Sequence, residues 1–188
     1  DQRNYFACPY CEKPNPIGGH EYLDLLLDAD SFHELHSDLS VEDIDTRFNF
    51  HDYSDARRKN SGRSEAKDSL IVGYGNMYGL PVAIAVSEFR FMGGSMGAVF
   101  GEKMKLIIDY AIGEGLPLVV VTASGGARMQ EGTIALYQMA KTISSIIKLK
   151  NAGLPFISVL GHPTTGGALA SYAVQGDFIV SERKATVD

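Results

Sequence analysis

A tripeptide repeat constrains the fold of this chain more than any other feature of its sequence. Gly-Leu-Pro begins at residues 79, 115 and 153, so successive copies lie 36 and 38 residues apart. Each copy is followed by a short apolar, β-branched run, at 82–86, 118–122 and 156–160. Each run leads to a pair of glycines: Gly93-Gly94, Gly125-Gly126 and Gly166-Gly167. Because units that recur every ~20–50 residues stack on one another, the repeat predicts a layered or spiral architecture.

A helical pattern follows the first two glycine pairs. In both segments apolar residues recur three and four positions apart, which places them on one helical face. The two sets are Met104, Ile107, Ile108, Ala111 and Ile112, and then Leu136, Met139, Ala140, Ile143 and Ile147. The strand runs do not alternate, which favours a parallel sheet covered on both faces, and residues 70–74 and 177–181 are two further predicted strands. We therefore expect an α/β fold whose units each contain a strand, a glycine turn and a helix of about 15 residues.

Composition and charge exclude several classes of protein. Hydrophobic residues make up 45% of the 188 residues and charged residues 21%, which is typical of a folded chain. The longest apolar runs, such as 116–121, fall far short of the ~18 residues of a membrane span, and the first residues are too polar for a secretory signal. A net charge of −6 argues against nucleic acid as a partner. Two cysteines cannot form a disulfide framework, and their spacing, Cys8-x-x-Cys11, indicates metal or redox chemistry in a reducing compartment.

Composition also divides the chain into three regions. Residues 1–27 contain the cysteine pair and a turn-rich stretch. Residues 28–68 are polar and mixed in charge, which indicates a surface arm or linker with short helices. Residues 69–188 are apolar, regular and punctuated by glycine, and we expect them to form the folded core.

The glycine pairs have two interpretations that the sequence leaves open. A turn between a strand and a helix often needs glycine for its backbone conformation alone. Alternatively, bare N–H groups at a helix N-terminus can bind an anion, and a developing oxyanion would make the site an oxyanion hole. Arg128 is equally open, since it could contact an anion or form a buried ion pair with Glu131.

Other glycine motifs fit poorly. Residues 93–97 match the G-x-S-x-G pattern of hydrolases, but the acid that would follow, Asp109, lies in the middle of the next predicted helix. The Gly-Lys-Ser/Thr ending of a phosphate-binding loop and the G-x-G-x-x-G dinucleotide pattern are both absent from the sequence.

Three long motifs in order resemble the β subunit of the carboxyltransferase of multisubunit acetyl-CoA carboxylase. They are Phe-Met-Gly-Gly-Ser-Met-Gly at 91–97 with Gly-Glu-Lys at 101–103, Ala-Ser-Gly-Gly-Ala-Arg-Met-Gln-Glu-Gly at 123–132, and His-Pro-Thr-Thr-Gly-Gly at 162–167. The resemblance runs in register from about Cys8 to Ala185. It implies a crotonase-like spiral of repeated ββα units, with the core at 69–188 incomplete at its C-terminal end and a partial zinc-ribbon segment at 1–27.

The resemblance also implies a function. A carboxyl group would move from carboxybiotin, on a separate biotin carboxyl carrier protein, to acetyl-CoA, giving malonyl-CoA for fatty acid biosynthesis. The carboxyltransferase α subunit, in an α2β2 heterotetramer, and biotin carboxylase would be partners, in a bacterial cytoplasm or a plastid stroma. The thioester enolate would be stabilised by the N–H groups of Gly166 and Gly167, carried over as the catalytic pair. The residues expected to bind acyl-CoA are Gly93, Gly94, Gly125, Gly126, Arg128, Thr164 and Thr165.

The N-terminal cysteines depart from the family pattern. The family carries a four-cysteine zinc ribbon, whereas only Cys8 and Cys11 occur here, so a structural Zn²⁺ would need two further ligands from outside this sequence. Either the chain begins after the first cysteine pair, or the ribbon is degenerate. Two other classes of function stay open: a biotin-independent acyl-CoA enzyme of the crotonase type, and a zinc-ribbon binding module.

Overall fold

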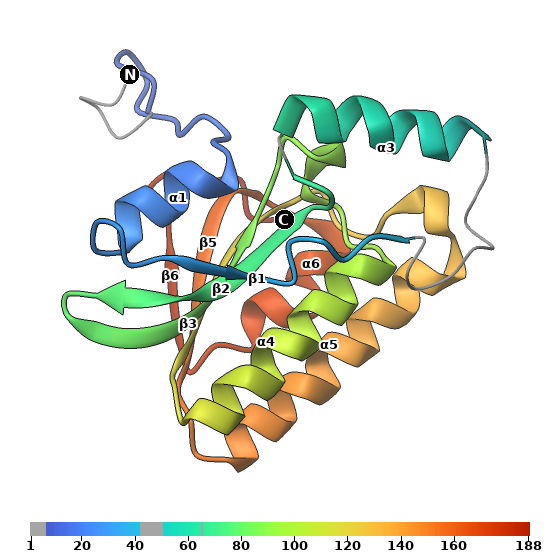
Figure 1. Cartoon of the computed structure of the whole chain (residues 1–188). Helices are drawn as coiled ribbons and strands as arrows, with labels where there is room; N and C mark the ends of the chain where they lie inside the picture. Colours follow the sequence, from blue (N-terminus) through green and yellow to red (C-terminus); the bar gives the residue numbers. More distant parts are fainter. Residues whose placement is uncertain (1–6, 42–50, 65) are drawn as a thin grey trace.

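A six-stranded mixed sheet organises the chain. The computed structural model describes residues 7–41, 51–64 and 66–188 (Figure 1). The strands lie in the order β1-β2-β3-β4-β5-β6. Their bounds are β1 His33–Leu35, β2 Leu70–Met77, β3 Leu80–Ser87, β4 Leu118–Ser124, β5 Phe156–Thr164 and β6 Phe178–Ser181. All five strands predicted from apolar runs are therefore confirmed, and β1 is an additional strand from the polar arm.

The sheet changes from antiparallel to parallel at β3. Strands β1, β2 and β3 pair antiparallel, whereas the pairs β3–β4, β4–β5 and β5–β6 are parallel. The β2–β3 hairpin turns at Tyr78 and Gly79, both at positive φ, and both N–H groups donate to the Asp28 carboxylate. The parallel strands all end at one edge, where each glycine pair follows its strand.

Helices cover both faces of the central strands. Helix α4 (Ala98–Glu114) packs on one face against Ala83, Ala85 and Val120, with α5 (Thr133–Asn151) beside it. Helix α1 (Gly19–Leu26) packs on the opposite face, against the alternate residues Val82 and Ile84 (Figure 1). Every residue of β4 is buried, so the prediction of a central strand covered on both sides is confirmed.

The predicted buried face of α5 is wrong. Leu136, Ala140 and Ile147 of that stripe are exposed. The residues that α5 buries are Ala135, Gln138, Thr142, Ser145, Ile146 and Leu149. This smaller, more polar face allows close approach to α4, because a Cβ built on Gly101 of α4 would lie 2.0 Å from Gln138 Oε1. Apolar residues on both faces of α5 made the helical periodicity ambiguous.

The three repeat units are less alike than the sequence predicted. Only the first contains two strands before its helix, as β2-β3-α4, whereas the others are β4-α5 and β5-α6. The third helix, α6, is a single turn at Gly166–Leu169 and is followed by the short 3₁₀ helix η5 (Tyr172–Val174). The prediction of a helix of about 15 residues after each pair therefore holds for α4 and α5 and fails for α6.

The polar arm contributes more structure than its composition suggested. It contains β1 and a 14-residue helix, α3 (His51–Ser64), which lies near the carboxyl ends of the parallel strands (Figure 1). Residues 42–50 and 65 of the arm, and residues 1–6 of the N-terminal segment, lie outside the described residues. In the part of the chain that the structure describes, no helix is both long and apolar enough to cross a membrane.

Candidate active site

The three glycine pairs meet at the carboxyl ends of β3, β4 and β5. The Gly125 N–H donates to the Gly93 carbonyl at 2.9 Å, which joins the first pair to the second. A Cβ built on Gly126 would lie 2.9 Å from the Gly167 nitrogen, so the second pair is in contact with the third. The sequence repeat therefore brings three loops from distant parts of the chain to one place.

Two of these glycines are required by the backbone itself. Gly94 has φ of 64°, and its Cβ would lie 2.0 Å from the Ala123 carbonyl oxygen. Gly126 has φ of 107° and faces the main chain of the third pair. A side chain is strained at such φ values, and here it would also collide with backbone. The conformational interpretation of the glycine pairs is therefore correct at these two positions.

Some main-chain N–H groups beside the pairs have no acceptor in the part of the chain that the structure describes. Gly166 is not one of them, since its N–H donates to the Asp188 carbonyl at 2.8 Å. Within residues 7–41, 51–64 and 66–188, neither Gly167 N–H nor Ala127 N–H has an acceptor. These amides are neighbours, because a Cβ built on Gly167 would lie 3.3 Å from the Ala127 nitrogen. The structure thus brings together one predicted donor, Gly167, and one donor that sequence reasoning missed, Ala127.

The orientation of Ala127 follows from a short parallel bridge with Met96. The Met96 N–H donates to the Gly126 carbonyl, and the Arg128 N–H donates to the Met96 carbonyl, each at 2.8 Å. Because alternate residues of an extended segment point their amides in opposite directions, the Ala127 N–H turns away from Met96. Such a bridge joins segments far apart in sequence, so the sequence carried no signal for it.

Thr164 and Thr165 shape the third loop. The Thr164 hydroxyl is buried and lies within hydrogen-bond distance of two carbonyl oxygens, those of Thr122 at 2.9 Å and Gly161 at 2.8 Å. The Thr165 N–H and hydroxyl both donate to the Ser124 carbonyl, at 3.0 and 3.1 Å. These side chains therefore position Gly166 and Gly167 against the second loop.

An open cleft of about 530 Å³ lies next to the loops. Gly93, Gly125 and Ala127 line its floor, and Ala56 and Asn60 of α3 form one wall. The other lining residues are Phe89, Met92, Ser95, Arg128, Met129, Gln130 and Pro163. Among these described residues no Asp, Glu, His, Lys or Cys side chain lines the cleft. The cleft therefore offers apolar contact area, main-chain polar groups and the uncharged polar residues Asn60, Ser95 and Gln130.

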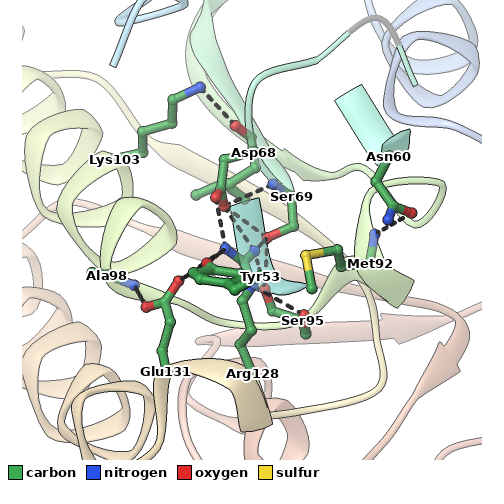
Figure 2. A network of polar contacts seen from close by, with 11 residues as sticks. Tyr53, Asn60, Asp68, Ser69, Met92, Ser95, Ala98, Lys103, Arg128 and Glu131 are labelled. Carbon is green, nitrogen blue, oxygen red and sulfur yellow. Dashed lines mark hydrogen bonds and ion pairs between the residues drawn. The ribbon is translucent and has the colours of Figure 1, made fainter. Parts of the chain in front are cut away.

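Arg128 is the centre of a buried polar network, shown in Figure 2. Its guanidinium forms a two-pronged ion pair with Asp68, at 2.7 and 3.0 Å, and a further ion pair with Glu131 at 3.1 Å. The same guanidinium also donates to Ser69 Oγ, the Ser95 carbonyl, Ser95 Oγ and the Tyr53 hydroxyl, so some of its N–H groups are shared between two acceptors. The side chain has 0% exposure, so it does not face a ligand. Of the two interpretations of Arg128, the geometry supports the ion pair with Glu131.

The pKa values explain why the network stays charged. Burial opposes the charge on Arg128, but Asp68 outweighs it through its carboxylate and hydrogen bonds, so the pKa of Arg128 is raised. Burial likewise opposes ionisation of Asp68, and Arg128 holds the pKa of that carboxyl below its usual range. Lys103 is also buried, which lowers its pKa, and its ammonium donates to the Leu70 carbonyl at 3.0 Å. Two cations and two carboxylates therefore compensate one another in the interior.

The N-terminal cysteines lie apart from this site. Cys8 and Cys11 are free thiols in a turn closed by the Glu12 N–H, which donates to the Cys8 carbonyl at 2.8 Å. Hydrogen bonds from the Cys11 and Tyr10 main chain lower the pKa of the Cys8 thiol. Within the part of the chain that is described, no three His, Cys, Asp or Glu residues cluster as metal ligands. Two thiols do not complete the four ligands of structural zinc, so a zinc site is not formed by these residues alone.

Comparison with known sequences identifies relatives over nearly the whole chain. The model of the carboxyl transferase domain family matches residues 20–187. The acetyl-coenzyme A carboxylase carboxyl transferase subunit beta of a Synechococcus species is 44% identical over 186 residues, which cover 99% of this chain and 59% of the relative. The subunit of the same name from Citrifermentans bemidjiense is 43% identical, covering 99% of this chain and 66% of the relative. The chain thus spans about three fifths of the length of these relatives.

Solved structures give a consistent result. The chain is similar to transcarboxylase 12S with hydrolysed methylmalonyl-coenzyme A bound, with a TM-score of 0.75 and 29% identity over 94% of this chain and 31% of that one. It is also similar to the Pseudomonas malonate decarboxylase MdcD-MdcE heterodimer, with a TM-score of 0.66 and 25% identity over 90% of this chain and 63% of that one.

Proposed function

Because the chain belongs to the carboxyl transferase domain family, we propose that it acts in the β subunit of the carboxyltransferase of multisubunit acetyl-CoA carboxylase. The reaction transfers a carboxyl group to the acetyl methyl carbon of acetyl-CoA and gives malonyl-CoA. The names of the 44% and 43% identical relatives support this assignment. The observation that carries it is the pair of neighbouring residues Ala127 and Gly167, whose N–H groups have no acceptor among the described residues and of which Ala127 lines the cleft.

The proposed role of these amides is to stabilise an enolate. Removal of a proton from the acetyl methyl group places negative charge on the thioester oxygen, and the enolate carbon then forms the new bond to the carboxyl carbon. Fixed N–H donors that face the developing charge need no reorganisation during the reaction, and each is worth about 2.7–4 kcal/mol. We assign Ala127 N–H and Gly167 N–H as these donors, in place of the Gly166 N–H that the Asp188 carbonyl occupies.

The composition of the cleft supports a role for this chain in binding and orienting acetyl-CoA, with the base supplied from elsewhere. Its described lining contains no side chain suited to general acid or base catalysis. Biotin, attached to a carrier protein, would supply both the carboxyl group and the base. This chain would bind acetyl-CoA, with Gly93, Gly94, Gly125 and Gly126 shaping the thioester slot, and orient its carbonyl. We infer that the sheet described above belongs to a crotonase-like spiral.

The assembly is part of the same proposal. We infer that the α subunit supplies the biotin side of the site in an α2β2 heterotetramer, with the biotin carboxyl carrier protein and biotin carboxylase as further partners. We place the enzyme in a bacterial cytoplasm or a plastid stroma. Cys8 and Cys11 would be half of a zinc site if two further thiolates join them, and zinc analysis of the complete subunit tests this.

The decisive experiment is a transfer assay on the complete subunit, with and without its α subunit. We expect malonyl-CoA from acetyl-CoA and carboxybiotin in the assembled enzyme, and none from the isolated β subunit. No product from an enzyme of verified assembly refutes the proposal. Turnover of an acyl-CoA without any biotin donor favours a biotin-independent enzyme of the crotonase type instead, and salt-dependent nucleic-acid binding without activity favours a zinc-ribbon module.

A further inference from the structure

Helix α3 forms a wall of the cleft although it belongs to the polar arm. Ala56 and Asn60, one turn apart on this helix, both line the cleft. The first glycine loop contributes Met92, Gly93 and Ser95 to the same lining. The width of the cleft at this place therefore depends on what holds α3 against the core.

The Tyr53 hydroxyl makes the deepest attachment of α3 (Figure 2). It donates a short hydrogen bond to Glu131 Oε1 and accepts one from Arg128 Nη1 at 3.2 Å. The side chain is 3% exposed, and burial beside the Glu131 carboxylate raises its pKa, so the hydroxyl remains a donor. A second attachment lies nearer the surface, where the Met92 N–H donates to Asn60 Oδ1 at 3.3 Å.

Glu131 connects this hydroxyl to the loops of the site. Its other oxygen, Oε2, accepts the Ala98 N–H at 2.5 Å, at the start of α4, so Glu131 joins α3 to α4. Arg128, the second partner of the hydroxyl, donates to the Ser95 carbonyl at 2.8 Å. Arg128 also follows Ala127 directly in the chain. One hydroxyl therefore contacts both residues that fix the first and second glycine loops relative to α3.

We propose that Tyr53 is a positioning residue that holds α3 as the fixed wall of the acyl-CoA cleft, acting through Glu131 and Arg128. The proposal rests on the proposed function for the identity of the ligand, but not for the attachment itself. Tyr53 does not line the cleft, so it acts on the ligand only through the placement of α3. Without the hydroxyl, Arg128 still has its bonds to Asp68 and the Ser95 carbonyl, so the loss of this attachment moves α3 and leaves the proposed amide donors in place.

The test is Tyr53→Phe in the assembled enzyme. The ring and its contact with the Arg57 guanidinium, at 5.1 Å, are retained, and only the hydroxyl is lost. We expect the KM for acetyl-CoA to rise about tenfold, the effect of one lost hydrogen bond to a charged group, while kcat and the KM for carboxybiotin stay within about twofold. We also expect amide hydrogen exchange to accelerate about tenfold in α3 and to remain unchanged in β3 and β4.

The control is Ile108→Val. Ile108 is fully buried in α4, away from the cleft lining, so its truncation loosens the core without touching α3. We expect it to leave the KM for acetyl-CoA and the exchange of α3 unchanged. If Tyr53→Phe does not fold, Asn60→Ala removes the second attachment without disturbing a buried charge. Because Asn60 itself lines the cleft, amide exchange in α3 is then the deciding readout, and we expect a smaller acceleration.

Each outcome decides the proposal. Faster exchange in α3 together with a raised KM for acetyl-CoA supports it. Unchanged exchange in α3 overturns the attachment, and faster exchange with an unchanged KM overturns the role of α3 as a wall. A fall in kcat alone overturns it as well, since it would place Tyr53 in the chemical step. Because hydrogen exchange needs no turnover, an assembled enzyme that fails the transfer assay refutes the proposed function separately.

Discussion

Replacing Gly167 with alanine tests the oxyanion assignment most directly. The added methyl would lie 3.3 Å from the Ala127 nitrogen and 3.4 Å from Met139 Sδ and Met96 Cε. These contacts are tight but not prohibitive, and φ of Gly167 is not in the left-handed region. The strain of overpacking, about 1 kcal/mol, is offset by the reduced entropy of the unfolded chain, about 0.4–1 kcal/mol. We therefore expect the variant to fold with nearly unchanged stability.

The effect on turnover should be much larger. The methyl would stand between the two available amides, where a substrate oxygen must approach to within about 2.7–3.1 Å of each donor. Loss of one such donor costs about 10²–10³ in kcat. Steady-state malonyl-CoA formation by the assembled enzyme measures kcat, and urea unfolding measures stability.

Gly113→Ala is the matched control. Gly113 lies in α4, and a Cβ there meets nothing within 4 Å. Alanine is favoured over glycine in a helix interior by about 1 kcal/mol. Because Gly113 lies in the last turn of α4, we expect a smaller gain in stability and unchanged turnover. If Gly167→Ala folds and retains kcat within about twofold of the parent, the assignment of these amides is refuted.

Three further predictions follow from the interior and the third loop. Arg128→Met leaves Asp68 and Glu131 as uncompensated buried carboxylates, so urea unfolding should show a loss of about 3–5 kcal/mol, and a loss below about 1 kcal/mol would contradict the network. Gly94→Ala should not yield folded protein, because its Cβ would lie 2.0 Å from the Ala123 carbonyl oxygen. Gly93→Ala has open space around its Cβ and should lower the free energy of unfolding by about 1–2 kcal/mol. Equal stabilities of the two variants in denaturant titration would exclude this reasoning. Burial and the nearby Lys13 charge lower the pKa of His162 below 6.5, although the Glu182 carboxylate acts in the opposite direction. As pH falls, His162 is therefore protonated in the unfolded chain before it is protonated in the folded chain. The contribution of neutral His162 to the free energy of unfolding is present above pH 6.5 and is lost as pH falls through the lower folded pKa. Because His162 Nδ1 accepts the Thr186 N–H at 3.0 Å, protection of that amide from exchange, corrected for intrinsic rates, should fall in the same range; constant protection there would disprove the link.

The strands were predictable because burial on both faces leaves a direct mark on composition. The runs at 82–86, 118–122 and 156–160 became β3, β4 and β5, and their repeat placed the glycine pairs at one edge. The face of α5 was not predictable, because apolar side chains also occupy its exposed side. The short α6 was missed for a related reason: the repeat suggested a length that the third unit does not have.

Part of the candidate site was likewise predictable from the sequence, and part was not. Gly167 follows from the glycine pattern, but the orientation of Ala127, the second proposed donor, follows from its bridge to Met96, 31 positions earlier. Tyr53 and Glu131 are 78 positions apart, and the connection between them is a property of the folded chain alone. Local sequence patterns indicate strands and turns, whereas contacts between distant segments depend on how those elements pack.

The meeting of three strand ends has a consequence for how this fold can diversify. The cleft is lined by the loops after β3 and β4, by α3 and by Pro163 near the end of β5, and the sheet hydrogen bonds beneath do not depend on loop length. The loops contact one another through Gly93, Gly125 and Gly126, so these positions tolerate little change. Side chains elsewhere in the cleft lining, such as Met92 and Gln130, can be exchanged while those main-chain contacts are kept, and new specificity can arise there.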